Sequence, residues 1–267
     1  GEIGMVDAIS NGRIECGFAR AFLPHEFARF GVSVDESRAR FEEGFEAVKR
    51  LLEDESASFE GKFHKFKNVT SLPRPTQKPR PPFWVAALAT PESFEKAGTA
   101  GHSVMGIPMT GAKMKELLGI YRSAWRAAGH KGTGRVMLAF HMFCHEDGNG
   151  ARDIAREPLN RYLKSLVDAA SDWTGMSSKD YPGYDKIISG LRAENFETQT
   201  AKGAAWVGTP EQIRKTIADY QDLTGGFEIA SLQVNFNNIP YEEALRSMTL
   251  FSKEVMPHFA GMAKAAE

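Results

Sequence analysis

Residues 81–97 read PPFWVAALATPESFEKA, an apolar run followed by a typical helix start. Residues 83–88 are continuously apolar, which predicts a strand that is buried on both faces. Thr90 and Pro91 then supply a residue that favours the helix N-cap and a proline that favours the first helical turn. A buried strand that leads directly into a helix is the repeating unit of α/β proteins with parallel sheets.

The rest of the chain repeats this alternation of strand and helix. Further strands are predicted over residues 13–19, 103–107, 135–144 and 229–236. Helices are predicted over residues 1–10, 111–129, 151–170 and 241–258, and after the helix-start patterns at Ser33–Glu36, Thr90 and Thr209. About five strands are too few for an eight-stranded barrel. A doubly wound sheet is not favoured either, because no glycine-rich phosphate loop is present.

Composition narrows the class of protein. The chain has 267 residues, of which 42% are hydrophobic and 25% are charged, with a formal net charge of -1. This balance is typical of a globular protein and gives no electrostatic reason to expect nucleic acid or an anionic membrane as a partner. The two cysteines, Cys16 and Cys144, have no metal-binding or redox spacing, and no signal-peptide pattern is seen. A cytoplasmic protein without a metal site or membrane span is therefore expected.

Several sequence blocks, taken in order, point to one family. They are VDAISNGRIECGFAR at 6–20, EGKF at 60–63, PRPTQKPRPPFWVA at 73–86, VGTPE at 207–211 and LFSKEVMP at 250–257. In order and spacing they resemble the bacterial-luciferase-like flavin-dependent monooxygenases. The resemblance implies a (β/α)8 TIM barrel and one domain over residues 1–267. It also implies that about the first three βα units are missing from the chain, which accounts for a helix that is already running at residue 1.

The resemblance places the phosphate of flavin mononucleotide (FMN) between two elements, and the residues suit that task. Arg20 follows the predicted strand 13–19, and its guanidinium can hold a phosphate through two hydrogen bonds. The helix start at Thr90 offers free backbone N–H groups, with the Thr90 and Ser93 hydroxyls as further donors. Glu92 is counted with the site although its carboxylate competes for the same helix dipole. The small residues Ala86 and Ala87 would let the flavin ring approach the backbone.

The predicted irregular stretch 171–203 matches the position of the family's mobile lid. Its aromatic residues Trp173, Tyr181 and Tyr184 are candidates to line the substrate site and exclude water. His141, in an apolar strand, is interpreted as a core histidine with its hydrogen bonds satisfied. No catalytic residue is assigned. Luciferases carry a reactive cysteine immediately before the arginine, and this chain has Ala19 there, which argues against light emission.

The resulting expectation is a two-component monooxygenase. Reduced FMN would come from a partner flavin reductase, and O2 would oxygenate a small apolar or aromatic organic molecule. The resemblance also implies a homodimer. Two alternatives stay open: a deazaflavin (F420)-dependent reductase or dehydrogenase on the same fold, and a non-catalytic flavin-binding protein.

Overall fold

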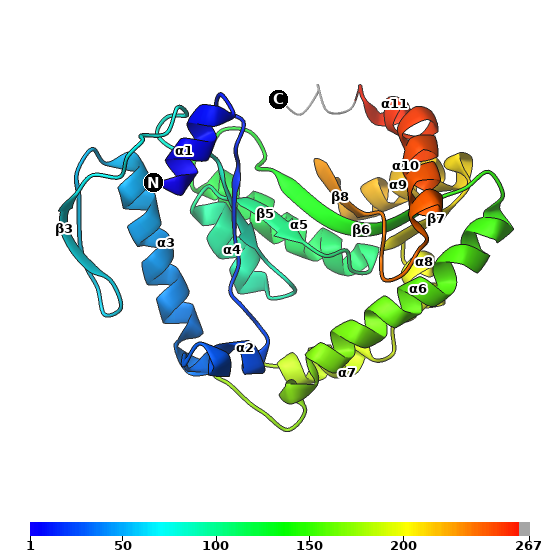
Figure 1. The fold of residues 1–267 in the computed structure, drawn as a ribbon, viewed down its shortest axis with the longest axis horizontal. Coiled ribbons are helices and arrows are strands. Elements are labelled where there is room, and N and C mark those ends of the chain that lie inside the picture. The colour runs from blue at the N-terminus through cyan, green and yellow to red at the C-terminus, as the bar shows by residue number, and fades with distance from the viewer. Residues whose placement is uncertain (262–267) are drawn as a thin grey trace. The chain divides into compact units, whose positions relative to one another are not determined.

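A computed structural model describes residues 1–261 (Figure 1). The chain forms two compact units, which are described in turn. Unit 1 comprises Gly1–Ala86 and Asp172–Tyr184, and unit 2 comprises Ala87–Ser171 and the chain from Asp185 onward. No helix in the described part of the chain is long and apolar enough to cross a membrane.

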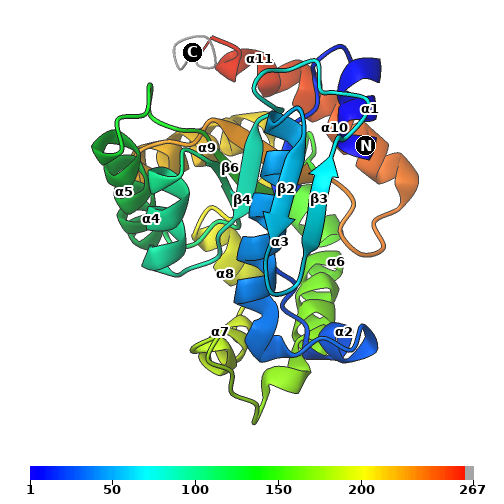
Figure 2. The same ribbon diagram turned by 90° about the vertical axis from the view of Figure 1, so that its left-hand side faces the viewer.

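Unit 1 combines a parallel strand pair with helices and a hairpin. Strands β1 (Cys16–Phe18) and β4 (Phe83–Ala86) pair in parallel, with Cys16 opposite Phe83. Its helices are α1 (Glu2–Ile9), α2 (Pro24–Arg29) and α3 (Ser37–Glu53), with the 3-10 turns η1 (Val34–Glu36) and η2 (Ser171–Trp173), the latter beginning in unit 2. An antiparallel hairpin of β2 (Ala57–Glu60) and β3 (Lys65–Val69) lies beside α3 (Figure 2).

The core of unit 1 is built on three phenylalanines from β1, α3 and β4. The rings of Phe18, Phe45 and Phe83 meet edge to face, with centroids 4.7–5.2 Å apart. Such aromatic pairs add stabilisation beyond the area they bury. They fix the carboxyl end of β1, from which the chain continues to Arg20.

Helix α1 is tied to the proline-rich segment through Asp7. The carboxylate accepts hydrogen bonds from the Gln77 backbone N–H and side-chain amide, both at 2.8 Å. Burial alone would raise the pKa of Asp7, but the hydrogen bonds from Gln77 outweigh it and hold the pKa below its usual value. At Gly4 a Cβ atom would lie 2.1 Å from the Pro73 carbonyl oxygen, so only glycine allows this close approach.

Unit 2 contains four strands that pair in parallel: β5 (Ser103–Gly106), β6 (Val136–Cys144), β7 (Ala205–Gly208) and β8 (Ile229–Gln233). β6 is the central strand and pairs with the other three. The helices are α4 (Pro91–Thr99), α5 (Gly111–Ala127), α6 (Gly148–Ala169), α7 (Tyr184–Leu191), α8 (Phe196–Ala201), α9 (Pro210–Thr224), α10 (Tyr241–Glu254) and α11 (Met256–Phe259). Tyr184, the first residue of α7, belongs to unit 1.

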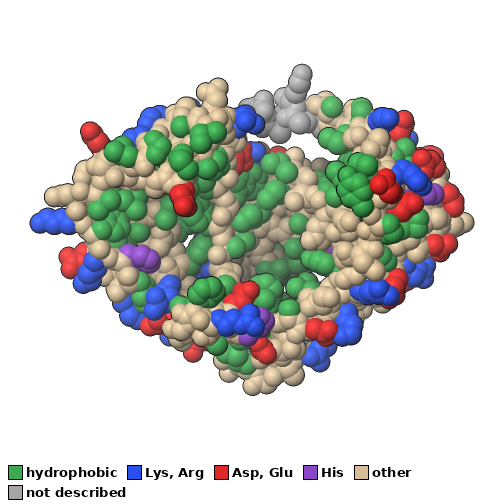
Figure 3. Space-filling view, viewed as in Figure 1, with side chains coloured by type: hydrophobic (Ala, Val, Ile, Leu, Met, Phe, Trp, Pro, Cys, Tyr) green, Lys and Arg blue, Asp and Glu red, His purple; other side chains and the backbone are tan. Residues whose placement is uncertain are grey.

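The side chains of β6 alternate between two environments. Val136, Leu138, Phe140 and Met142 are buried, and the Phe140 ring stacks on Trp206 of β7 with centroids 4.1 Å apart. Met137, Ala139 and His141 point to the other face and keep part of their surface exposed. Hydrophobic side chains are visible over β5 and β6 in the space-filling view (Figure 3).

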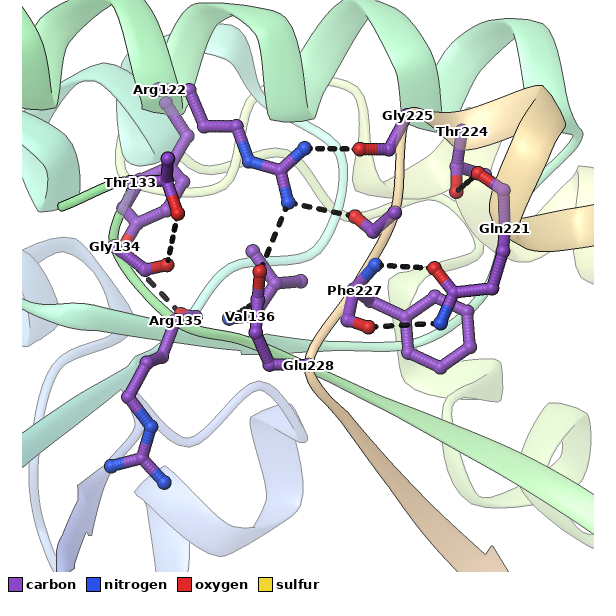
Figure 4. A network of polar contacts seen from close by, with 12 residues as sticks. Arg122, Thr133, Gly134, Arg135, Val136, Gln221, Thr224, Gly225, Phe227 and Glu228 are labelled. Atoms are coloured by element: carbon purple, nitrogen blue, oxygen red, sulfur yellow. Dashed lines mark hydrogen bonds and ion pairs between the residues drawn. The ribbon is translucent and has the colours of Figure 1, made fainter. Parts of the chain in front are cut away.

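The start of β8 is fixed by a polar network around Arg122 of α5 (Figure 4). Its guanidinium donates to the carbonyls of Gly225 and Gly226 and to the carboxylate of Glu228. Glu228 in turn accepts from the backbone N–H of Val136 at 2.7 Å and donates its own N–H to the Val136 carbonyl at 3.0 Å. The network sets which residues of β8 lie opposite which residues of β6.

The structure corrects several predictions about elements. Six strands take part in parallel pairs where about five were expected, because β7 was not predicted. The hairpin β2–β3 was also missed, and the predicted strand 13–19 shortens to Cys16–Phe18. The stretch 171–203 is not irregular throughout, since it contains α7 and α8. The helix-start pattern at Ser33–Glu36 begins the 3-10 turn η1 rather than α3: Ser33 accepts from the Asp35 N–H, and Glu36 pairs with Arg40.

Candidate functional site

Arg20 lies just after the carboxyl end of β1, as predicted. Its Nη1 donates to Ser37 Oγ at 3.3 Å and to the Asp180 carbonyl oxygen at 3.2 Å. Its guanidinium carbon stands 4.5 Å from the centre of the Tyr181 ring, a cation–π geometry. Arg20 therefore holds the segment Asp172–Tyr184 against the loop that follows β1.

The three predicted lid aromatics lie together in unit 1. The rings of Trp173, Tyr181 and Tyr184 contact one another with centroids 4.9–5.3 Å apart. Trp173 donates its indole N–H to the Phe22 carbonyl at 2.7 Å, and the Tyr181 hydroxyl donates to the Ala21 carbonyl. Trp173 and Tyr181 are buried. Desolvation raises the pKa of Tyr181 and of Tyr184, which keeps both hydroxyls neutral.

Two acidic residues add polar contacts to this segment. Asp180 accepts from the Arg38 backbone N–H at 2.9 Å and from Ser37 Oγ at 3.4 Å. Asp172 contacts the Nδ1 atom of His25, the second residue of α2, at 3.0 Å. The segment 172–184 is thus held at both ends within unit 1.

A cavity of about 370 Å³ opens beside Arg20 in unit 1. Its lining combines the guanidinium with apolar side chains and a few polar ones: Ala19, Arg20, Ala21, Glu26, Phe27, Phe30, Val32, Ser37, Arg40 and Phe41. A largely apolar hollow with few polar groups is the usual form of a small-molecule site.

The predicted phosphate site at the start of α4 belongs to unit 2. Thr90 occupies the N-cap position and Pro91 the first helical position, but the Thr90 side chain does not cap the helix. Its hydroxyl shares a hydrogen bond of 2.7 Å with Ser93 Oγ instead, so two hydroxyls stand together at the helix N-terminus. Glu92 is exposed and forms an ion pair of 3.1 Å with Lys96. Its carboxylate thus has a cationic partner one turn further along the helix.

Ala86 ends β4 in unit 1 and is exposed, and Ala87 begins unit 2 and is buried. The Ala87 backbone N–H donates to the Met105 carbonyl at 2.9 Å, which ties this residue to β5. Of the predicted flavin-site residues, two therefore belong to unit 1: Arg20 and Ala86. The others belong to unit 2: Ala87, Thr90, Glu92 and Ser93.

The environment of His141 differs from the predicted one, a core position with its hydrogen bonds satisfied. Its Nε2 atom is buried, but it has no hydrogen-bond partner within residues 1–261, so it is not a satisfied core histidine. Burial lowers the pKa of His141 to about 4, which leaves the imidazole neutral at pH 7. The rings of Tyr162 and Phe236 contact it edge to face, at centroid distances of 4.8 and 5.3 Å.

Sequence reasoning missed Ser37 and Asp180, which connect Arg20 to the segment 172–184. No local signal marks either residue, because Ser37 lies 17 residues and Asp180 lies 160 residues from Arg20 in the chain. The two cysteines, Cys16 and Cys144, are buried and free. No cluster of three or more metal-ligating side chains occurs in the described residues.

Comparison with known proteins assigns the family. The family model for luciferase-like monooxygenases matches residues 1–225. The oxygenase component of flavin-dependent trigonelline monooxygenase from Acinetobacter baylyi is 33% identical over 274 residues, which cover 97% of this chain and 71% of that protein. This chain belongs to the luciferase-like monooxygenase family.

Two solved structures of monooxygenases resemble this chain over most of its length. Monooxygenase RslO1 from Streptomyces bottropensis is 39% identical with a TM-score of 0.78, and the match covers 97% of this chain and 73% of that one. The oxygenating constituent of 3,6-diketocamphane monooxygenase from Pseudomonas putida, in complex with FMN, has a TM-score of 0.76 at 19% identity and covers 96% and 73% of the two chains. The second match shows the common fold alone, an α/β arrangement of parallel strands and helices.

Proposed function

We propose that this protein is the oxygenase component of a two-component monooxygenase that uses reduced FMN and O2 to oxygenate a small apolar or aromatic organic molecule. The observation that carries the proposal is membership of the luciferase-like monooxygenase family over residues 1–225. The relative from Acinetobacter baylyi, itself named an oxygenase component, supports a separate flavin reductase as partner.

The residues present suit an FMN phosphate. Thr90 leaves the first turn of α4 without a side-chain cap, and its hydroxyl and that of Ser93 stand at the positive end of the helix dipole. The Glu92 carboxylate, which would otherwise repel an anion, is paired with Lys96. We assign Thr90 and Ser93 to the phosphate, and the small side chains of Ala86 and Ala87 to close approach of the flavin ring.

Arg20 is the remaining residue assigned to the phosphate. A guanidinium has five N–H donors, and the contacts with Ser37 and Asp180 both use Nη1. Donor capacity is therefore left for an anion. Bound FMN would supply the oxygen chemistry, while the chain orients it and keeps water away. The buried rings of Trp173 and Tyr181 are suited to the exclusion of water.

Three further proposals rest on the family. We propose the closed (β/α)8 barrel as the architecture to which these parallel strands and helices belong, and a homodimer as the assembly. A cytoplasmic location is supported by the two free, buried cysteines, since reducing compartments keep thiols unpaired.

Titration with flavins tests the cofactor assignment. We expect FMN to bind more tightly than riboflavin, which lacks the phosphate, when binding is followed by flavin fluorescence. Thr90→Val should weaken FMN binding about tenfold, roughly the effect of one hydrogen bond to a charged group, and leave riboflavin binding unchanged. The matched control is Thr209→Val, because Thr209 begins α9 with the same Thr-Pro-Glu pattern and does cap its helix. Equal affinity for FMN and riboflavin would contradict the phosphate assignment.

Reaction with oxygen tests the activity. Reduced FMN bound to the protein should consume O2 with kinetics that differ from those of free reduced FMN, and a ring substrate should then gain one atom from 18O2, detected by mass spectrometry. Binding of F420 in place of FMN, with substrate reduction and no oxygen uptake, would instead support the deazaflavin-dependent alternative. Flavin binding without any turnover would support the non-catalytic one.

A further inference from the structure

The partly exposed face of β6 continues onto β8. Because paired residues of neighbouring strands lie on the same face, the register places Ala139 beside Ser231 and His141 beside Gln233. Ala139 and Ser231 are small, whereas His141 and Gln233 are polar and lie toward the carboxyl ends of their strands. In α/β proteins the carboxyl ends of parallel strands form the edge where ligands bind.

Two aromatic rings complete the surroundings of His141. Tyr162 comes from α6, and Phe236 follows β8 in the chain; both contact the imidazole edge to face. Phe236 belongs to a cluster of buried hydrophobic residues in unit 2, and Tyr162 packs against this cluster. The imidazole therefore lies at the border between this core and the partly exposed face of the sheet.

The polar atoms of this group have unused hydrogen-bonding capacity. Gln233 Nε2 lies 3.2 Å from the Tyr162 hydroxyl oxygen and donates to it, so the hydroxyl proton of Tyr162 remains for another acceptor. His141 Nε2 is buried and without a partner in the described part of the chain. A buried polar atom left unpaired is unfavourable, so a ligand that supplies the missing partner gains binding energy there.

We propose that His141, Tyr162 and Gln233 form a recognition site for the hydroxyl group of an uncharged phenol. The O–H of the phenol would donate to His141 Nε2, and its oxygen would accept from the Tyr162 hydroxyl. Gln233 holds Tyr162 in place for this contact. The proposal deepens the proposed function, on which it rests, by assigning the substrate class of the monooxygenase.

The surroundings favour a neutral aromatic ring over other hydroxyl compounds. The imidazole is neutral and none of the three side chains carries a charge, so a carboxylate or phosphate group would have no counter-ion from them. Tyr162 and Phe236 offer ring edges and faces to an aromatic ligand. Ala139 and Ser231, which lie beside each other in the sheet, present only small side chains to the body of the ring. His141 and Tyr162 both keep part of their surface exposed, so a ligand can approach the group from this face of the sheet.

Binding of phenol and of anisole, its methyl ether, tests the proposal. Anisole has the same ring and an oxygen acceptor but no O–H to donate. Isothermal titration of the full chain without flavin should give phenol at least about fivefold higher affinity than anisole, as expected for one neutral hydrogen bond. His141→Phe should abolish this preference. His258→Phe, which introduces the same residue at an exposed position of α11, should retain it.

A measurement on the unaltered protein guards against a variant that does not fold. In protein with 15N-labelled histidine, phenol should shift the 15N resonance of His141 Nε2 and anisole should not, with the resonance assigned by its loss in His141→Gln. Equal affinity for phenol and anisole in the unaltered protein, or no change at this resonance with phenol, would overturn the proposal. Because these readouts use no flavin, a failure to bind FMN or consume O2 would reject the proposed function without altering them.

Discussion

His141 is a neutral histidine on β6, and its burial has a consequence for stability. The pKa of its imidazole falls from 6.5 to about 4 because burial disfavours the charged form. Between these two values the unfolded chain binds more protons than the folded chain. The contribution of His141 to the free energy of unfolding is therefore fully present above pH 6.5 and decreases as the pH falls toward 4.

We accordingly expect the unaltered protein to lose stability relative to His141→Phe when the pH is lowered below 6.5. The difference should grow by no more than about 1.4 kcal/mol per pH unit. Urea unfolding of both proteins at several pH values measures it, and His258→Phe should follow the unaltered protein. Parallel pH profiles for the unaltered protein and His141→Phe would show that His141 is protonated as readily when folded as when unfolded.

At the residue scale, the sequence predicted positions better than contacts. Arg20 at the end of a strand and Thr90 at a helix start follow from local patterns, and the structure confirms both positions. The bonds of Arg20 to Ser37 and Asp180, and the missing partner of His141, depend on segments far apart in the chain. No spacing rule in the sequence connects such segments, so these features were not predicted.

Helices α4 and α5 approach each other closely at Gly98. A Cβ atom at this position would lie 2.3 Å from the Tyr121 carbonyl oxygen and 3.0 Å from Ala124 Cβ. Gly98→Ala should therefore lower the free energy of unfolding by about 1–3 kcal/mol, because the helices must separate. Gly119→Ala is the matched control: a Cβ atom at Gly119, in α5, would meet open space, and alanine favours helix there by about 1 kcal/mol. Thermal unfolding distinguishes the two, and a Gly98→Ala protein as stable as Gly119→Ala would contradict this description of the packing.

At the scale of elements, length decided what the sequence revealed. The helices α3, α5, α6, α9 and α10 each run for 14 residues or more and carry a clear apolar face, and all were predicted. The elements that escaped prediction are short: β7 has four residues, α2 and α8 have six each, and α7 has eight. Too few residues lie on one face of such an element to establish a period. The strands of the hairpin β2–β3 have only four and five residues, and most of their side chains are exposed, so no long apolar pattern marks them.

At the scale of the whole molecule, opposite charges nearly cancel. The formal net charge is -1 and the isoelectric point calculated from the sequence is about 6.7. Proteins repel one another least near this pH. Solubility in low-salt buffer should therefore be lowest near pH 6.7 and higher at pH 8.5, as measured by the concentration left after precipitation with polyethylene glycol. Lys67→Glu, at an exposed position of β3, should move the solubility minimum to lower pH. A solubility minimum at unchanged pH would show that surface patches, rather than net charge, control association.

The alternation along β6 separates two kinds of evolutionary constraint. Even-numbered positions from Val136 to Met142 face the packed interior, where a change of volume affects folding. Odd-numbered positions from Met137 to His141 face the other way and can vary with much less effect on that packing. Related enzymes should therefore differ more often at the odd-numbered positions of β6 than at the even-numbered ones. A library randomised at Met137, Ala139 and His141 alone could diversify substrate choice while most of its members still fold.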